Sequence, residues 1–522
     1  MIKYKVKQLT IEISKSLNIS KTKFTKLENR LNEIKDSENT LLKYESTYLR
    51  QEIKEYYEKQ LEAAKIRSRI KTFEDGEKSS KFFFNTERRN ATDKIWTKIK
   101  CRDGTYKSDI NTILNEQRFF YKTLFTSEGT NEKEASALLN NVDESLSTDE
   151  RELCDKEITE QEICNAIKLL KTNKSPGDDG IVAEFYKEYW YLIHKDFTKV
   201  LRYIFESNTL APSQYNAMLT LLYKKGERED IKNWRPISLL NVDYKIITKI
   251  LAERIKQVLP SIIHSDQKGF VRGRNICEAN RLLQDIIFYT DQNQINSAVI
   301  FLDYEKAFDR VEWSWTLNCL RKFNFGTKFT SWINMIFKHA KTSILTNGFR
   351  SSFFKISRSM RQGCPVSPLL FILQAEPLAC AIRKNRDIKG IPLPYISLET
   401  GEREEAKING YVDDSQLFVS TEDSINECFK VLNCYEMSSG AKINKNKTFG
   451  LYTGAWKNKT PLFNEIQWTK TNVKTLGINH GYEIDEAAIW LQKINKMKSC
   501  IQVWKSRDLT YKGKVLIVKT FL

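Results

Sequence analysis

Three aspartates stand where they could form an oxygen-only cation site. Asp303 follows the continuous apolar run 298–302, which predicts a strand buried on both faces. Asp413 and Asp414 interrupt the alternating apolar pattern of residues 408–419, which predicts a tight hairpin with both carboxylates at its tip. The chain has only four histidines and no Cys-x-x-Cys pair, so any metal must be held by oxygen.

Carboxylates in this pattern suit magnesium, which prefers oxygen ligands and is usually completed by substrate phosphates. Two such ions, about 3.5–4 Å apart, bind the attacking and leaving oxygens of an in-line phosphoryl transfer. We expect Asp303 and Asp413 to bridge two Mg²⁺ ions, with Mn²⁺ as a possible substitute, and Asp414 to complete the shell. The alternative is that the Asp pair merely forms a turn and that Asp303 caps a helix starting near Glu305.

The composition narrows the class of protein. With 522 residues and 41% hydrophobic residues, the chain exceeds one core. Its net charge of +18 is typical of a protein with a polyanionic partner, most often nucleic acid. On charge alone, an ordinary basic enzyme is an equally good interpretation. The longest apolar stretch, 365–382, is broken by Gln374 and Glu376, and the N-terminus lacks a signal-peptide core. We therefore expect an intracellular protein without a membrane segment, whose ten cysteines are reduced and mostly buried.

An ordered series of motifs resembles the reverse transcriptase of non-LTR retrotransposons of the LINE class. The motifs cover nearly the whole chain, and eight of them in the family's order make chance negligible. The eight are Ser175–Gly180, Asn233–Asn241 with Asp243–Arg254, Gln267–Asn275, Phe301–Asp309, Arg361–Leu370, Tyr411–Asp414, Gly440–Asn444 with Lys447-Thr448, and Thr475–Ile478. The resemblance continues upstream at Gly76–Phe84 and downstream at Trp504–Thr510. A group II intron maturase shares the catalytic core but is disfavoured by the stretches at 76–84, 233–254 and 504–514.

The resemblance implies an α+β, right-hand polymerase fold with fingers, a palm built on an antiparallel sheet, and a partial helical thumb. We expect a helical N-terminal linker at 1–75, because apolar residues recur at helical spacing among Lys and Glu without proline. The other expected segments are an N-terminal extension at 76–150 ending in the acidic linker 127–150, fingers at 151–295, the palm at 296–482 and the start of the thumb at 483–522.

The resemblance also implies contacts with an incoming dNTP. The residues concerned are Lys224, Arg235, Phe308, Gln362, Gly363 and Lys447. The Phe308 ring would clash with a ribose 2′-hydroxyl, and the Arg235 fork suits paired phosphate oxygens. A core phenylalanine and a solvated basic face are the alternatives. Lys442 or Lys447 could protonate the departing pyrophosphate, although surface lysines are the simpler reading.

Further residues are expected to hold the nucleic acid and the metal. Gly269, Arg272, Gly273 and Arg274 combine close backbone approach with charge and would grip the template. Leu476 and Gly477 match the family's primer-grip turn, or form a plain β-turn. The backbone carbonyl of Tyr304 is expected to join the three aspartates as a metal ligand.

The predicted function is RNA-directed DNA synthesis, with an RNA template, a DNA primer or target, and dNTPs as partners. The alternative is an inactive, truncated remnant that only binds RNA, but the retained site residues favour turnover. Relatives usually begin with an endonuclease domain, for which the chain shows no segment before Lys21. We therefore expect a copy truncated at both ends, with nicking supplied by a missing domain or another protein. Cytoplasm and nucleus are implied by the resemblance alone.

Overall fold

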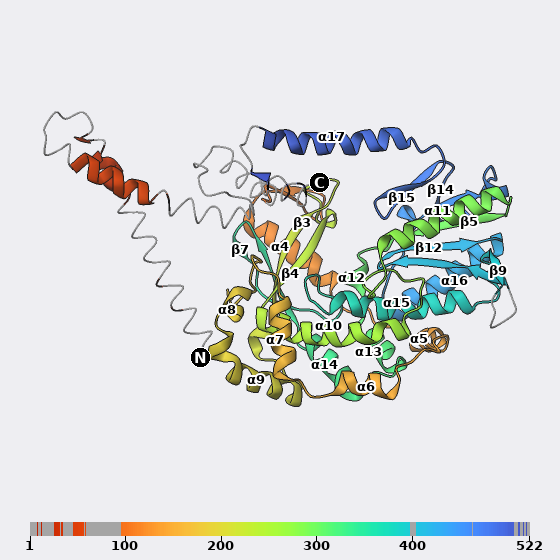
Figure 1. Cartoon of the computed structure of the whole chain (residues 1–522), viewed down its shortest axis with the longest axis horizontal. Coiled ribbons are helices and arrows are strands. Elements are labelled where there is room, and N and C mark those ends of the chain that lie inside the picture. Colours follow the sequence, from red (N-terminus) through yellow and green to blue (C-terminus); the bar gives the residue numbers. More distant parts are fainter. Residues whose placement is uncertain are drawn as a thin grey trace.

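The computed structural model describes residues 95–396, 403–461 and 463–505, with scattered positions in 8–58 and 510–518. Most of the expected N-terminal linker and residues 76–94 lie outside the described part. Within the linker, residues 26–31 and 45–56 are described as helical, which agrees with the predicted amphipathic helices. The described chain combines helices and sheets, as the predicted α+β class requires (Figure 1).

A central five-stranded sheet carries the strands predicted to present carboxylates. Its strand order is β11, β12, β5, β13, β14, and only the β13–β14 pair is parallel. The strands are β11 (Ile408–Tyr411), β12 (Asp414–Val419), β5 (Ser297–Leu302), β13 (Phe449–Thr453) and β14 (Gln467–Thr469). All six residues of β5 are buried, as the continuous apolar run predicted.

Helices cover both faces of this sheet, which explains why β5 needs apolar residues throughout. Ala298, Ile300 and Leu302 belong to one buried cluster with α15, whereas Val299 and Phe301 belong to another with α11. Figure 1 shows α11 on one side of the sheet and α15 and α16 on the other. The covering helices are α11 (Ile276–Gln292), α15 (Ser367–Lys384) and α16 (Glu422–Ser439), and α13 (Trp313–Lys322) packs on α15.

A second sheet lies beside the first and is covered by α4 (Ile110–Leu124). Its strands are β4 (Trp234–Leu240), β3 (Asn216–Tyr223), β6 (Lys341–Thr346) and β7 (Phe349–Arg350), with β8 (Phe354–Lys355) paired to β6. The predicted apolar run at 218–223 is thus strand β3. Because β3 pairs with β6, this sheet joins residues from both sides of the predicted boundary at 295/296, and the largest buried cluster crosses it too.

The remaining described elements surround these two sheets. The helices are α7 (Glu160–Leu169), α8 (Ala183–Glu188), α9 (Trp190–Ser207), α10 (Val242–Ile262), α12 (Ala307–Arg310), α14 (Thr327–Phe337) and α17 (Glu486–Lys505), with short 3₁₀ turns η1 (Pro212–Tyr215), η2 (Ile231–Asn233), η3 (Lys445–Lys447) and η4 (Gly454–Trp456). The strands are β1 (Ile99–Lys100), β2 (Tyr106–Lys107), β9 (Ile391–Ile396), β10 (Arg403–Ala406), β15 (Asn472–Thr475) and β16 (Ile478–Gly481).

The acidic segment 127–150 is folded, so the prediction of a linker there was wrong. It contributes α5 (Glu132–Leu139) and the start of α6 (Thr148–Asp155), whose N-caps are Asn131 and Ser147. Most of its few apolar side chains, including Leu138, are buried, and α5 packs on α16. The polar composition suggested a linker because each of these short helices exposes most of its surface and needs only one narrow apolar stripe to pack.

Most of the described cysteines are buried, as expected. The nine described cysteines are free thiols, and five of them are buried. In the part of the chain that the structure describes, every helix is too short or too polar to cross a membrane. The buried polar side chains Gln374 and Glu376 interrupt helix α15, which contains most of the apolar stretch 365–382.

Candidate active site

The β11–β12 hairpin places two carboxylates at a tight turn, as the alternating pattern predicted. Tyr411 pairs with Asp414 across the strands, so Val412 and Asp413 form a two-residue turn. Val412 has a φ of +63°, which is rare for a β-branched residue. Such a backbone conformation persists only where the surroundings hold it in place. The position of Asp413 therefore depends on groups that support the turn.

Asp303 lies at the same end of the central sheet. Leu302, the last residue of β5, pairs with Ser415 of β12. Continuing this antiparallel register by one residue places Asp303 opposite Asp414, and Cβ atoms of directly opposed residues are about 4.5–5.5 Å apart. The Asp303 carbonyl accepts a hydrogen bond of 2.7 Å from the Asn444 N–H. The register thus brings together two positions that are 111 residues apart in the chain.

The alternative role for Asp303, as a helix cap, does not hold. Helix α12 begins at Ala307, with Lys306 as its N-cap. The Asp303 N–H instead donates to Thr448 Oγ1 at 3.3 Å. The backbone beside Tyr304 is fixed by two hydrogen bonds to residues 442–444, and neither uses the Tyr304 carbonyl. Asp303 is therefore held at a strand end with its side chain outside any cap.

The charges of the three aspartates interact. Burial raises the pKa of Asp303, Lys447 and Lys224 oppose this shift, and the Asp413 charge adds to it. Desolvation and the charges of Asp413 and Asp303 raise the pKa of Asp414. A carboxyl pKa that is raised by a neighbouring carboxylate charge indicates that the two negative charges are close enough to repel each other. A cation among them would relieve this repulsion.

The donor set fits a hard divalent cation in an open site. All three side chains offer carboxylate oxygens, the ligands that Mg²⁺ prefers. Among the described residues, however, no three His, Cys, Asp or Glu side chains converge closely enough to hold a metal ion by themselves. An ion here would need waters or substrate phosphates to complete its shell, as is usual for Mg²⁺. Metal binding by Asp303, Asp413 and Asp414 stays a prediction.

Three basic side chains face these carboxylates. Lys224 follows strand β3, Arg235 lies on β4, and Lys447 ends η3, and all three are exposed. Both Lys224 and Arg235 lower the pKa of Asp414. Burial and the neighbouring Arg235 charge lower the pKa of Lys224. The two sheets thus bring a cationic and an anionic group of residues together, which suits a ligand that carries both phosphates and a metal.

Phe308 contributes a ring at the edge of this site. It is half-buried and stacks on Phe371 of α15, with ring centroids 4.4 Å apart and planes 13° apart. The Phe308 carbonyl accepts from the Met360 N–H at 2.7 Å. The ring is therefore fixed by packing yet retains an exposed side, so both proposed readings, a core residue and a contact for the nucleotide sugar, fit its position.

Gln362 and Gly363 join the strand β4 to the site. The Ser238 N–H donates to the Gln362 carbonyl at 2.8 Å. Gly363 has a φ of +112°, and a Cβ there would lie 2.7 Å from the Ser238 carbonyl oxygen. The close approach that we expected of Gly363 is therefore to the protein's own strand. The Gln362 side chain donates to Asp309 Oδ1 at 3.3 Å.

The loop 267–275 packs against the hairpin, which revises two expectations. Arg274 donates to the carbonyls of Ile263, His264 and Gln267, at 2.6–2.8 Å, so its guanidinium braces the loop instead of being free to grip a template. A Cβ on Gly269 would lie 2.5 Å from Val412 Cγ2, so its close approach is also internal. Arg272 and Gly273 are exposed and keep the predicted role as a hypothesis.

The turn at Leu476 and Gly477 connects β15 to β16. Both residues have positive φ, +48° and +82°, as a two-residue hairpin of the primed type requires. The predicted β-turn is confirmed, and contact with a primer stays a prediction.

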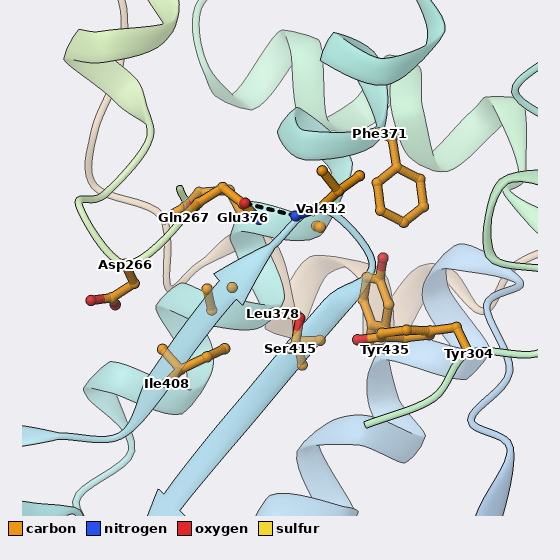
Figure 2. Close-up of a pocket in the computed structure, with 13 residues that line it drawn as sticks. Asp266, Gln267, Tyr304, Phe371, Glu376, Leu378, Ile408, Val412, Ser415 and Tyr435 are labelled. Carbon is orange, nitrogen blue, oxygen red and sulfur yellow. Dashed lines mark hydrogen bonds between the residues drawn. The ribbon is translucent and has the colours of Figure 1, made fainter. Parts of the chain in front are cut away.

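Two residues that the sequence analysis left without a role belong to the site. Asp309 is buried, and burial raises its pKa to about 7. Gln267 is buried beside the β11–β12 hairpin, and its side-chain oxygen accepts a hydrogen bond from the Val412 N–H (Figure 2). Both residues belong to the motifs Phe301–Asp309 and Gln267–Asn275, but only their neighbours in three dimensions show what their polar atoms bind.

Comparisons with known proteins agree with this geometry. Residues 222–480 match the family described as reverse transcriptase (RNA-dependent DNA polymerase). The chain is 30% identical over 500 residues to a transposon TX1 uncharacterized 149 kDa protein of Xenopus laevis, covering 94% of this chain and 37% of that protein. It is 28% identical over 238 residues to a retrovirus-related Pol polyprotein from the type-1 retrotransposable element R2 of Popillia japonica, covering 45% and 32%.

A third relative is a probable RNA-directed DNA polymerase from transposon BS of Drosophila melanogaster, 27% identical over 316 residues, covering 56% of this chain and 32% of that protein. The chain spans about a third of the length of these relatives. The matched residues 222–480 include the three aspartates and the basic side chains that face them. Residues 222–480 therefore form a reverse transcriptase domain, and the chain is a member of the reverse transcriptases related to those of non-LTR retrotransposons.

Proposed function

We propose that this chain extends a primer 3′-hydroxyl with dNTPs on an RNA template, as part of a LINE-type retrotransposon protein. The observation that carries the proposal is the register of the central sheet, which brings Asp303 beside Asp414 inside the matched domain. Lys224, Arg235 and Lys447 around these acids suit a triphosphate. RNA template, DNA primer and dNTPs are the partners that this reaction requires.

The subdomain roles follow from the positions of the elements. The central sheet would serve as the palm and the second sheet with its helices as fingers, whereas α17 would begin the thumb. Because β6, β7 and β8 pair into the second sheet, the fingers would include residues 341–355 in addition to 151–295.

In the proposed reaction, the primer 3′-oxygen forms a bond to the α-phosphorus, the bond to the β-phosphate oxygen breaks, and pyrophosphate leaves with its electron pair. Asp303, Asp413 and Asp414 would hold divalent cations, which supply charge neutralisation when bound. Arg235 and Lys224 would orient the triphosphate. Such fixed charges act where charge develops during phosphoryl transfer.

Phe308 would select the sugar in this arrangement. Its ring is braced by Phe371, so it cannot easily turn away from a ribose 2′-hydroxyl. Lys447, exposed near Asp303, would contact the phosphates, and Lys442 is exposed as well. One of these two lysines would protonate the departing pyrophosphate, as the family resemblance implies.

Primer extension on an RNA template tests the proposal. Asp413→Asn should lower the rate by about 10³-fold or more, because loss of a metal-holding carboxylate removes several kcal/mol of charge stabilisation. Asp285→Asn is the matched control, since Asp285 is exposed on α11 and only forms a surface pair with Arg281. It should retain the wild-type rate.

The alternative function, RNA binding without turnover, has its own signature. Wild type and Asp413→Asn would then incorporate equally little dNTP with ample Mg²⁺, while both bind RNA with equal affinity in a filter assay. That result would end the polymerase proposal for this chain. A clear difference between wild type and Asp413→Asn would exclude the alternative.

A further inference from the structure

The strained turn of the catalytic hairpin has one specific support. The Val412 N–H donates to Gln267 Oε1 at 2.9 Å, and this bond is buried. Figure 2 shows the Gln267 side chain reaching the start of the turn from a separate segment of the chain. Val412 needs such a support because its φ of +63° is unfavourable for a β-branched residue.

The same oxygen serves a second donor. Gln267 Oε1 also accepts from the Gly269 N–H at 2.9 Å. The loop that carries both residues runs beside β11 as a short parallel bridge, through bonds between Lys268 N–H and the Gly410 carbonyl (2.8 Å) and between Gly410 N–H and the Asp266 carbonyl (3.1 Å). A single acceptor thus joins this loop to the catalytic turn.

The loop itself is rigidly held. Arg274 donates to three carbonyls of residues 263–267. The Asp266 carboxylate accepts from Arg383 at 2.9 Å, and Arg383 also pairs with Glu376 within α15. Because Gln267 is fixed at both its backbone and its side chain, its oxygen is positioned before any substrate arrives.

We infer that Gln267 is the positioning residue of the proposed polymerase site, holding the Val412 turn so that Asp413 and Asp414 face Asp303. The inference rests on the proposed function and adds to it a residue outside the aspartate motifs. Removing the acceptor leaves two buried N–H groups without a partner, and the turn can then leave its strained conformation. The carboxylates would lose their shared geometry, whereas the triphosphate contacts at Arg235 would remain.

The experiment compares two substitutions of similar size in steady-state primer extension. Gln267→Met removes the acceptor and should lower kcat at least tenfold, with KM for dNTP within threefold of wild type. It should also raise the Mg²⁺ concentration needed for half-maximal rate. Gln267→Glu keeps an oxygen that accepts from both N–H groups, so kcat should stay within about threefold of wild type. Equal kcat values for the two variants would overturn the inference.

A double-mutant cycle separates positioning from general packing. Val412→Gly tolerates the positive φ without a brace. In that background Gln267→Met should cost clearly less than it costs the wild type, and equal losses in both backgrounds would overturn the inference. If Gln267→Met does not fold, Gln267→Asn, which withdraws the acceptor by one methylene, takes its place in both comparisons.

The two proposals fail in different ways. If wild type and Asp413→Asn show the same baseline incorporation, the proposed polymerase function fails and the inference fails with it. If wild type is active and Asp413→Asn is not, while Gln267→Met retains wild-type kcat and Mg²⁺ dependence, only the role of Gln267 is lost.

Discussion

Gly363 offers a quantitative test of how the site is built, through the substitution Gly363→Ala. Its φ of +112° lies beyond the left-handed helical region that L-residues visit. An alanine Cβ would also lie 2.7 Å from the Ser238 carbonyl oxygen. That oxygen belongs to β4, which is paired along its length with β3, so it has little freedom to move away.

The expected cost has two parts. The backbone conformation costs about 1–2 kcal/mol for a residue with a Cβ. The overlap with a fixed carbonyl adds about 1–3 kcal/mol, the range for overpacked sites. Gly348→Ala isolates the first part, because Gly348 has a φ of +83° and open space where its Cβ would lie. The steric part is therefore the difference between the two variants.

Thermal unfolding measures this difference. One kcal/mol shifts Tm by about 2–4 °C in a domain of 150–250 residues, so a steric part of about 1–3 kcal/mol should make Gly363→Ala melt roughly 2–12 °C below Gly348→Ala. Primer extension by Gly363→Ala should fall as well, because the turn carries Gln362, whereas Gly348→Ala should keep its rate. Equal Tm values for the two variants would show that the Ser238 carbonyl yields, and would refute the argument from close approach.

Three other predictions concern the nucleotide pocket, pH and nucleic acid. Phe308→Val should raise the kcat/KM for ribonucleotides relative to dNTPs at least tenfold; an unchanged ratio would leave the ring a core residue. Burial raises the pKa of Asp309 to about 7, against roughly 4 for an unfolded Asp, so its contribution to stability is full below pH 4 and is lost as the pH rises through 7. The Tm of Asp309→Asn minus the Tm of wild type should therefore increase from pH 5 to pH 8. A constant difference would contradict the assigned effect of burial on the Asp309 pKa, which the Lys306 charge opposes. Arg272→Ala should reduce the slope of log K for template binding against log[salt] by about 0.7–0.9 without lowering Tm. Arg274→Ala should lower Tm, because three carbonyls lose their donor. The opposite pattern would reverse the roles of the two arginines.

The sequence predicted the elements that carry the acids because their signals are local. The buried strand β5 follows from an unbroken apolar run, and the hairpin follows from alternation around Asp413 and Asp414. Local signals failed where a short helix needs few apolar residues, so α5 was mistaken for linker. They also failed for Arg274, since a basic residue in a glycine-rich loop reads as a nucleic-acid contact until its carbonyl partners are known.

The sequence by itself determined the types of residue available for chemistry, the motif order that indicates a reverse transcriptase, and the strand and hairpin that end in carboxylates. Only the tertiary structure decided which of these residues are neighbours: the register of β5 on β12 sets Asp303 opposite Asp414, and the loop beside β11 brings Gln267 to the Val412 turn. The physical reason is that strand pairing and buried hydrogen bonds join segments more than 100 residues apart, and such long-range contacts leave no periodic trace in the amino-acid sequence.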